Sequence, residues 1–433
     1  MTNTRSAADA GPPSLLRHRD FMLLWNGQTI SELGSMITPF ALPFLAVTAL
    51  NASNFQVGLL TALGSLAFLL VALPAGVVVD RVARHRLMMW CDLLRAAVVI
   101  TVPVAWYLDT LTLTHLCVVA LVTGSLTVFF DVAYQSYVPV LVDKESLIDA
   151  NGKLGTTSSA AATVGPTVAG ILVAAIGGAR ALVADAASFL VSAASLFLIR
   201  TPEPKPARPD GPRPPFRQQM GEGLGFVVRH PVLRRIVACT ATVNLFSHMA
   251  SAMEMPFLVR ELGLSAGQAG LLLALGPVGG VAGGLLASRL ARKIGSARVI
   301  WLAPLALGLP SCLAPLAYPG WRVLLYGLGW FAFTFGALVY NTAQVTYRQQ
   351  ICPPELLGRM NAAVRWIVWG TIPLGALLGG AFATWVGLRA ALRIGLVGAS
   401  LGGLWVLFSP LRHLRDVETA PAETATGTGT ATG

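Results

Sequence analysis

The chain consists of long apolar runs separated by short polar connections. A helix needs about 20 mostly apolar residues to cross the hydrocarbon layer of a membrane. Twelve runs of about that length occur, at residues 21–48, 55–79, 87–108, 113–140, 153–176, 180–199, 235–258, 266–288, 297–317, 321–346, 362–385 and 390–410. The pattern therefore predicts an all-α integral membrane protein with twelve transmembrane helices.

The first six runs resemble the last six. Matching residues recur in the same order at an offset of 208 to 210 positions: Gly76, Arg81 and Arg84 as Gly284, Arg289 and Arg292, and Asn151, Gly165 and Gly170 as Asn361, Gly375 and Gly380. Several ordered matches at nearly one offset indicate an internal duplication. Parallel repeats about an axis normal to the membrane are known from one class of secondary transporters. We therefore expect two pseudo-symmetric six-helix halves.

A proline-rich, basic segment separates the two sets of runs. The end of the chain alternates Thr, Gly and Ala, a composition too polar and repetitive to pack. The predicted organisation is a cytoplasmic N-terminal tail at 1–20, a first half at 21–200, a cytoplasmic linker at 201–234, a second half at 235–411 and a disordered cytoplasmic tail at 412–433.

Composition excludes a soluble protein. Hydrophobic residues make up 55% of the chain and charged residues 12%, with a mean hydropathy of +0.67. Soluble domains carry about twice that charge. The net charge of +11 suggests nucleic acid at first, but 24 of the 31 Lys and Arg fall in the connections on one side. This asymmetry predicts a multi-pass cell-membrane (inner-membrane) protein in the lipid bilayer, with both termini in the cytoplasm and no nucleic-acid partner.

No residue pattern indicates an enzyme, a cofactor or a metal site. The five cysteines have no paired spacing, and none of the six histidines has a companion suited to catalysis. The only Gly-Lys pair, at Gly152, lacks the preceding glycine of a nucleotide-binding loop, because Leu147 stands there. A pump driven by a nucleotide is therefore excluded, and an ion gradient is the expected energy source.

The connection after the second run carries Gly76, Asp80, Arg81, Arg84 and Arg86. This spacing resembles the signature loop of the major facilitator superfamily, although Ala83 and His85 depart from it. The resemblance implies a latch in which Arg84 pairs with an acid of the fourth span, and Asp131 stands at the matching depth. A purely topogenic basic loop is the alternative interpretation.

The fifth run carries Gly152, Gly165, Pro166 and Gly170. These residues are similar to the antiporter motif of the drug-exporting branches, with Ala at two positions. Small residues also let helices approach closely, and proline bends a helix, so plain helix packing explains the same pattern. The segments 19–34 and 358–361 resemble the branch that contains macrolide and siderophore exporters.

Ionisable residues inside a membrane are functional candidates because they are costly to bury. Glu32 lies about 16 Å into the first run, near the midplane, and is the leading candidate for a proton or cationic-substrate site. Glu254 and His248, in the outer half of the seventh run, are candidates to line an outward vestibule. Asp92 and Arg95 are expected to neutralise one another as a structural pair. Asp185 is expected to reach the interface without a function.

Aromatic residues at membrane depth are candidates for apolar pocket walls. They are Trp25, Tyr134, Tyr340, Trp366 and Trp369. Most aromatic residues in spans only pack or sit at interfaces.

The resemblance implies a secondary active transporter that acts as a monomer. It would export an amphiphilic small molecule, such as a drug, a macrolide or a siderophore, by alternating access with proton antiport. Apolar span centres favour export over the alternative, a proton-coupled uptake permease for a small metabolite. A non-transporting membrane sensor on the same scaffold is a further alternative. The sequence leaves the substrate open, and also whether the coupling ion is H⁺ or Na⁺.

Overall fold

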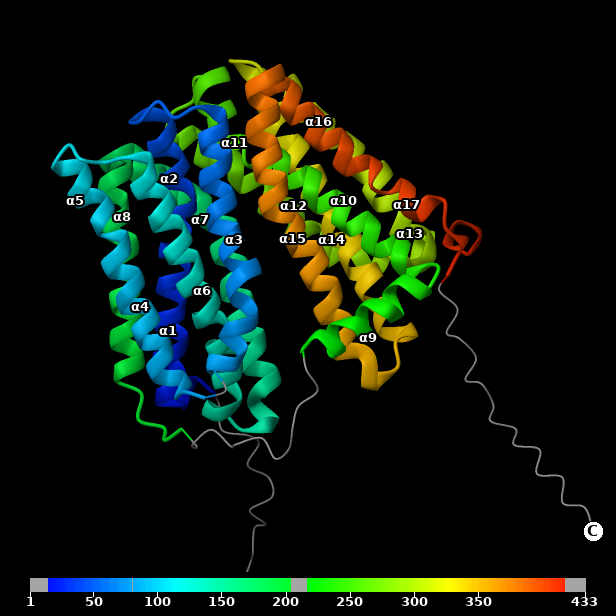
Figure 1. The fold of residues 1–433 in the computed structure, drawn as a ribbon, viewed down its shortest axis with the longest axis horizontal. Helices are drawn as coiled ribbons and strands as arrows, with labels where there is room; N and C mark the ends of the chain where they lie inside the picture. The colour runs from blue at the N-terminus through cyan, green and yellow to red at the C-terminus, as the bar shows by residue number, and fades with distance from the viewer. Residues whose placement is uncertain (1–14, 80, 204–215, 417–433) are drawn as a thin grey trace, which may run out of the picture.

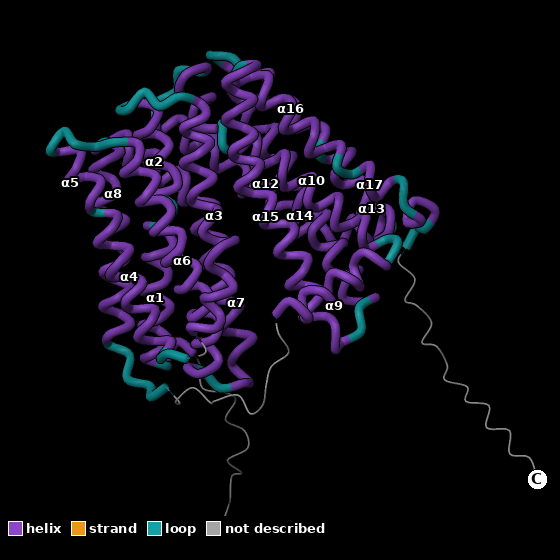
Figure 2. Tube along the Cα trace, viewed as in Figure 1, coloured by secondary structure: helices purple, strands orange, loops and turns teal. Residues whose placement is uncertain are grey.

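The computed structural model describes residues 15–79, 81–203 and 216–416. Within these ranges the chain is helical and contains no strand (Figure 2). Twelve helical segments are long and apolar enough to cross a membrane, which confirms the predicted fold class. Asp80 of the predicted latch lies outside the described residues, as do residues 1–14, 204–215 and 417–433.

The first half contains six spans, four built from one helix and two from broken pairs. In order they are α1 (Arg19–Gly34) with α2 (Ile37–Thr48), α3 (Asn54–Val79), α4 (Arg84–Val99) with α5 (Thr101–Tyr107), α6 (Leu113–Leu141), α7 (Leu147–Ile176) and α8 (Gly178–Phe197). Short 3₁₀ turns precede α1 at Leu15–Arg17 and α7 at Lys144–Ser146.

The second half repeats this order with more irregular helices. Span 7 is α10 (Leu233–Ser251) with α11 (Glu254–Pro256) and a π-helical turn (Phe257–Glu261), and span 8 is α12 (Ala266–Ile294). Span 9 is α13 (Ser296–Leu302) with a π-helical turn (Ala303–Leu307) and a 3₁₀ helix (Leu309–Leu316), and span 10 is α14 (Leu324–Ile351) after a 3₁₀ turn (Trp321–Val323). Span 11 is α15 (Pro354–Val386), and span 12 is α16 (Leu388–Leu401) with α17 (Leu404–Leu407). A 3₁₀ turn at Pro410–His413 follows α17.

The segment expected as a linker contains helix α9 (Phe216–Arg229), which packs against α15. Glu222 of α9 forms an ion pair with Arg359 of α15. Residues 412–416, expected at the start of the tail, remain against the second half: the Ala297 N–H donates to the Arg415 carbonyl, and the Ser296 N–H to the Asp416 carboxylate.

Spans 1 and 7 are both broken near their middle, and a proline explains each break. Proline has no N–H to donate to the carbonyl four residues earlier, and its ring clashes with that carbonyl. Pro39 stands four residues after Ser35, where α1 gives way to α2. Pro256 stands four residues after Ala252, where α10 gives way to α11. Both breaks lie in the first span of their half.

The bundle has two ends that differ in their connections. We call the end with the tight turns at 49–53, 177 and 387 the short-loop end, and the end with residues 198–232 the linker end. Figure 1 shows the halves meeting at the short-loop end and standing apart at the linker end. Hydrogen bonds across the junction agree: Arg260 donates to Asn54 Oδ1 at 2.8 Å, and Asn54 Nδ2 donates to the Ala383 carbonyl at 3.4 Å.

Glycines allow the backbones of the two halves to touch. A Cβ added to Gly58 of α3 would lie 2.9 Å from the Cα of Gly380 in α15, and one added to Gly170 of α7 would lie 2.8 Å from the Cα of Gly270 in α12. Both distances are shorter than real Cβ contacts. Gly170 corresponds to Gly380 in the repeat, so the duplication also relates the two contacts.

Replacing Gly270 by leucine should destabilise the junction, because the side chain would overlap the backbone of α7. We expect a loss of about 1–3 kcal/mol, as for other overpacked sites. Thermal unfolding of the purified protein in one detergent measures the effect. Gly284→Leu is the matched control in the same helix, since an added Cβ there meets nothing within 4 Å. Equal unfolding midpoints for the two variants would contradict the contact.

Candidate functional site

A cavity of about 370 Å³ lies between the two halves, at the level of the proline breaks. The first half lines it from α2, α3 and α7, and the second half from α10, α11, α12 and α14. The lining is mostly apolar: Met36, Pro39, Phe40, Pro43, Pro166, Ala252, Met255, Leu273, Gly276, Pro277 and Trp330, with the hydroxyls of Thr61, Ser251 and Thr334. We call it the inter-half cavity.

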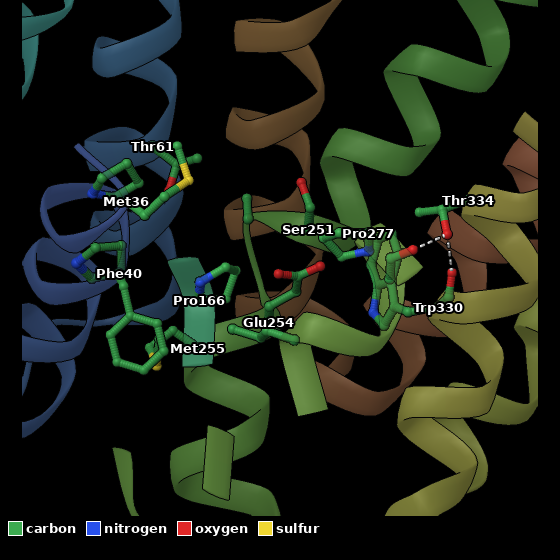
Figure 3. A pocket seen from close by; sticks show the side chains of 15 residues that line it. Met36, Phe40, Thr61, Pro166, Ser251, Glu254, Met255, Pro277, Trp330 and Thr334 are labelled. Carbon is green, nitrogen blue, oxygen red and sulfur yellow. Dashed lines mark hydrogen bonds between the residues drawn. The ribbon is translucent and has the colours of Figure 1, made fainter. Parts of the chain in front are cut away.

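Glu254 is the one ionisable residue in the lining of this cavity. It is the first residue after the break in span 7, and Figure 3 shows its carboxylate among residues from both halves. In the described part of the chain, no side chain donates a hydrogen bond to this carboxylate. A charged carboxylate is costly in apolar surroundings unless it is paired. Glu254 is therefore suited to hold a proton or to meet a cationic group.

The wall beside Glu254 carries polar groups from α14. The Thr334 hydroxyl donates to the Trp330 carbonyl at 3.0 Å and also to the Gly276 carbonyl (Figure 3). The buried Tyr326 hydroxyl interacts with the Trp330 side chain, which lines the cavity. These groups give the mostly apolar wall a small hydrogen-bonding capacity.

A second cavity, of about 450 Å³, adjoins the first inside the N-terminal half. The two cavities share Met36, Pro39, Pro43 and Thr61 in their linings. The second cavity extends to Asp185 of α8, with the hydroxyls of Thr123 and Thr127 along it, among others. We call it the N-half cavity.

Glu254 lines the inter-half cavity, but Glu32 and His248 do not. Glu32 is half-buried, accepts a hydrogen bond from Gln28 at 3.2 Å, and also interacts with the Ser158 hydroxyl of α7. It interacts electrostatically with Asp131 on α6. His248 is hydrogen-bonded through Nδ1 to the Asn244 carbonyl of its own helix at 2.9 Å.

The predicted pair of Arg84 with Asp131 is not formed in this structure. Arg84 instead pairs with Glu203 at 3.7 Å, and Glu203 also accepts the backbone N–H groups of Arg84 and His85 at 3.0 and 3.2 Å. The pair does not form because the two residues lie at different depths in the bundle. Arg84 is the first residue of α4, whereas Asp131 lies ten residues from the end of α6, about 15 Å deeper.

The remaining residues of the predicted latch are separate from this pair. Gly76 is half-buried, and the side chains of Arg81 and Arg86 are exposed. Nothing within 4 Å would meet a Cβ added to Gly76.

The antiporter-type motif is divided among three places. Pro166 lines the inter-half cavity, and Gly165 packs against the Met36 side chain in the same wall. Gly170 forms the contact with α12. Gly152 lies apart, beside Trp25 in a groove between α1 and α7.

None of the five predicted pocket aromatics lines the inter-half cavity. Trp25 donates to Thr157 at 2.9 Å, Tyr340 is hydrogen-bonded with Thr240 at 2.6 Å inside the second half, and Trp366 is half exposed. Tyr134 is half-buried, with a hydroxyl that has no partner in the described ranges. Trp369 stacks edge-on against Phe68 with ring centroids 4.3 Å apart, which joins the two halves.

Sequence reasoning missed the residues that surround Glu254, namely Met36, Phe40, Trp330 and Thr334. A signal for the place was available. Pro39 and Pro256 break equivalent spans of the two repeats, and broken spans mark binding sites in transporters of this architecture.

Comparison with known proteins agrees with this architecture. The sequence profile of the family described as transmembrane secretion effectors matches residues 10–428. The chain is 28% identical to the multidrug efflux pump Tap of Mycolicibacterium fortuitum, over 96% of this chain and 98% of that protein. It is 23% identical to macrolide efflux protein A of Streptococcus pyogenes, over 85% of this chain and 90% of that protein.

A solved structure shows the same fold. The crystal structure of a bacterial homologue of the iron transporter ferroportin, in an inward-facing state, superimposes with a TM-score of 0.70. The two chains are 16% identical, and the match covers 90% of this chain and 98% of the other.

Replacing Glu203 by alanine should destabilise the linker end of α4. Ala83, the residue before α4, provides no side-chain cap, so Glu203 supplies the acceptors for the first N–H groups. We expect a loss of about 1–2 kcal/mol, the usual effect of losing a cap. Glu203→Gln is the matched control because it keeps one acceptor oxygen, and it should lose less. Thermal unfolding midpoints in one detergent compare them, and an unchanged midpoint in the alanine variant would rule out the cap.

Proposed function

This chain belongs to the transmembrane secretion effector family of major facilitator transporters, and from that premise we propose that it exports an amphiphilic small molecule by proton antiport. Candidate substrates are drugs and molecules like macrolides or siderophores. The observation that carries the proposal is Glu254, the single ionisable group in a mostly apolar cavity between the halves. An apolar wall binds a hydrophobic body, and one carboxylate attracts a basic group.

The lining favours an exporter of amphiphiles over an uptake permease for a small metabolite. A small polar metabolite needs several convergent hydrogen-bonding groups for its recognition. The inter-half cavity offers three hydroxyls and one carboxyl among apolar side chains. The relatives named as multidrug and macrolide efflux pumps support the same direction of transport.

The membrane orientation follows from the charges. The linker end carries most of the Lys and Arg, so we place it in the cytoplasm together with both termini. The arrangement described above, with the halves joined at the short-loop end, then corresponds to an inward-facing state in the cell membrane. Both halves of the cavity come from one chain, which supports a monomeric transporter.

Alternating access would proceed by rocking of the halves about their contact. The glycine contacts at Gly58 and Gly170 lie toward the short-loop end, where they permit close backbone approach in the inward-facing state. Opening at that end requires these backbones to separate while the linker ends approach. The pair of Arg84 with Glu203 lies at the linker end and belongs to the first half. We propose that Arg84 changes its partner when that end closes.

Proton coupling would use two carboxyl groups in different places. Glu254 exchanges a proton for the basic group of the substrate inside the inter-half cavity. Glu32 lies in the first half, among polar groups near the linker end of the cavity wall, and we propose that it takes part in the proton path. Binding of substrate and release of a proton then oppose one another at Glu254, as antiport requires.

Replacing Glu254 by glutamine should reduce export strongly, because the basic group of the substrate loses its counter-charge. We expect at least about a tenfold fall in the initial rate of ethidium export, which corresponds to roughly 1.4 kcal/mol. The measurement is accumulation of ethidium or erythromycin in everted membrane vesicles with an acidic lumen, together with the lumen pH.

Glu261→Gln is the matched control for this variant. Glu261 follows in the same span, but it pairs with Arg389 at 3.4 Å and is not in the lining of the cavity. Its rate should remain close to that of the unaltered protein. Equal rates for the two variants would contradict a role of Glu254, and no transport of either compound by the unaltered protein would contradict the proposed substrate class.

A further inference from the structure

Arg95 lies at the centre of the N-terminal half and is almost completely buried. It is 11 residues from the start of α4, or about 16 Å from the linker end of that span. Its guanidinium pairs with Asp92 one turn earlier in the same helix. The rings of Phe130 on α6 and Phe189 on α8 each lie 4.4 Å from the guanidinium carbon. Arg95 therefore connects α4, α6 and α8.

Two further carboxyl groups surround this arginine. Asp131 follows Phe130 directly on α6, and Asp185 stands one turn before Phe189 on α8. Arg95 interacts electrostatically with both. The three acids thus come from three different spans, and among the described residues Asp92 is the one that forms an ion pair with Arg95. The expected pair of Asp92 with Arg95 is formed. The expectation that Asp185 reaches the interface is wrong, because Asp185 is 0% exposed.

The charges of this group do not balance without further protons. Three ionised carboxylates against one guanidinium leave two negative charges in the interior of the half. Buried charges without partners are strongly destabilising. The group becomes neutral when two of the three carboxyls carry a proton. The Asp92 carboxylate also interacts with the Ser192 hydroxyl of α8, and the Arg95 Nε–H is buried without an acceptor in the described part of the chain, so this donor is open to a further acceptor.

The N-half cavity reaches the same group from the side of α2. Asp185 lines it, and Arg95 Nη1 lies 3.4 Å from the hydroxyl of Thr127, which also lines it. The Thr123 hydroxyl in this lining is buried and has no partner among the described residues. A polar site of this kind can hold water and conduct a proton.

The carboxylate of Asp185 also contacts the break in span 1. It accepts a hydrogen bond from the hydroxyl of Thr38, the second residue of α2. A helix N-terminus favours a negative charge nearby. Loss of a proton from Asp185 therefore strengthens its attachment to α2, and gain of a proton weakens it. Met36 and Pro39, which flank Thr38, line the inter-half cavity, so a change at Asp185 would reach the substrate wall.

We propose that Asp92, Asp131 and Asp185 around Arg95 form an exchangeable proton-binding site in the N-terminal half, separate from the inter-half cavity. The proposal rests on the proposed proton antiport and adds to Glu254 a second place, behind the cavity wall, where a proton is held during the cycle. Asp131 is half-buried and is the entry group, and Asp185 is the group that acts on α2. A proton passes from the Glu32 carboxyl to the Asp131 carboxylate, and Arg95 then shifts its interaction toward Asp92 and Asp185.

The surroundings favour protons over a metal ion. Arg95 already places a positive charge among the acids, and this charge repels a second cation. Within the described ranges, no three His, Cys, Asp or Glu side chains are grouped closely enough to hold a metal. The other titratable groups facing the site are Cys91 on α4 and Tyr134 on α6, and α2 and α3 contribute none in their described residues.

Infrared difference spectra of the purified full chain in lipid nanodiscs test the site without any substrate. Spectra recorded between about pH 5 and about pH 9 span the range in which a buried carboxyl and water exchange protons. We expect carbonyl bands of protonated carboxyl groups, with one band lost in Asp185→Asn and one in Asp131→Asn. Thr38→Val keeps every carboxyl but removes the donor to Asp185, so it should shift the Asp185 band without removing it.

Asp149→Asn is the matched control, because Asp149 lies outside this group and pairs with Lys153 at 2.8 Å. Its spectrum should match that of the unaltered chain. Bands that persist in both Asp185→Asn and Asp131→Asn would overturn the proposal, as would bands that respond to Na⁺ and not to pH. If Asp185→Asn does not elute as a folded protein in size exclusion, Thr38→Val replaces it, and a constant Asp185 band in that variant would overturn the proposal.

A transport assay distinguishes failure of the proton site from failure of the proposed export function. If the unaltered chain exports ethidium, Asp185→Asn should retain ethidium exchange at equilibrium and lose accumulation driven by the pH gradient. Retained accumulation would overturn the proton site and leave the exporter intact. If the unaltered chain moves neither ethidium nor erythromycin, the proposed function fails, and the infrared bands still decide whether the acids bind protons.

Discussion

The two halves of this protein depend on direct backbone contact between paired helices. At Gly58 against Gly380 and at Gly170 against Gly270, the chains approach more closely than any side chain would permit. Lipid tails are as apolar as the helix surfaces, so close packing must supply much of the attraction between membrane helices. The inter-half cavity exists because the halves are held together on one side of it while its walls remain apart. Gly170 of one pair corresponds to Gly380 of the other in the duplication, so the two contacts are related to each other.

The chemistry of the cavity arises from two broken helices. In a membrane every backbone polar group needs an internal partner, and a break is tolerated only where protein or water surrounds it. Pro39 and Pro256 place such breaks in the first span of each half, and both lie in the wall of the inter-half cavity or next to it. The break in span 7 positions Glu254, and the break in span 1 brings Thr38 to Asp185. The duplication thus produced a helix break in each half, and the side chains at the two breaks differ: a carboxyl group at one and a hydroxyl group at the other.

Much of the fold could be predicted from the sequence, because the membrane imposes a minimum length on each apolar run and the duplication leaves matching residues. Glu254 and Pro166 were found as individual residues, one from its charge and the other from a motif. The neighbours of Glu254 were not found, because Trp330 and Thr334 come near it only through the packing of α14 against α12. Depth along a helix does not predict the partner of Arg84 or the surroundings of Asp185. Arg84 pairs with Glu203, which follows a different span, and Asp185 accepts a hydrogen bond from Thr38 of α2.

The composition of the cavity wall has an evolutionary consequence. A wall of methionine, proline, phenylalanine and leucine distinguishes ligands by volume more than by pattern, and one methylene group more or less changes binding by only about 1–3 kcal/mol. Such a protein can therefore acquire new substrates through single substitutions at many positions, each with a small effect on binding. Under the proton coupling proposed above, the carboxyl groups behind the wall could not change in the same way. Selection for resistance would then alter the apolar lining first and leave the acids unchanged.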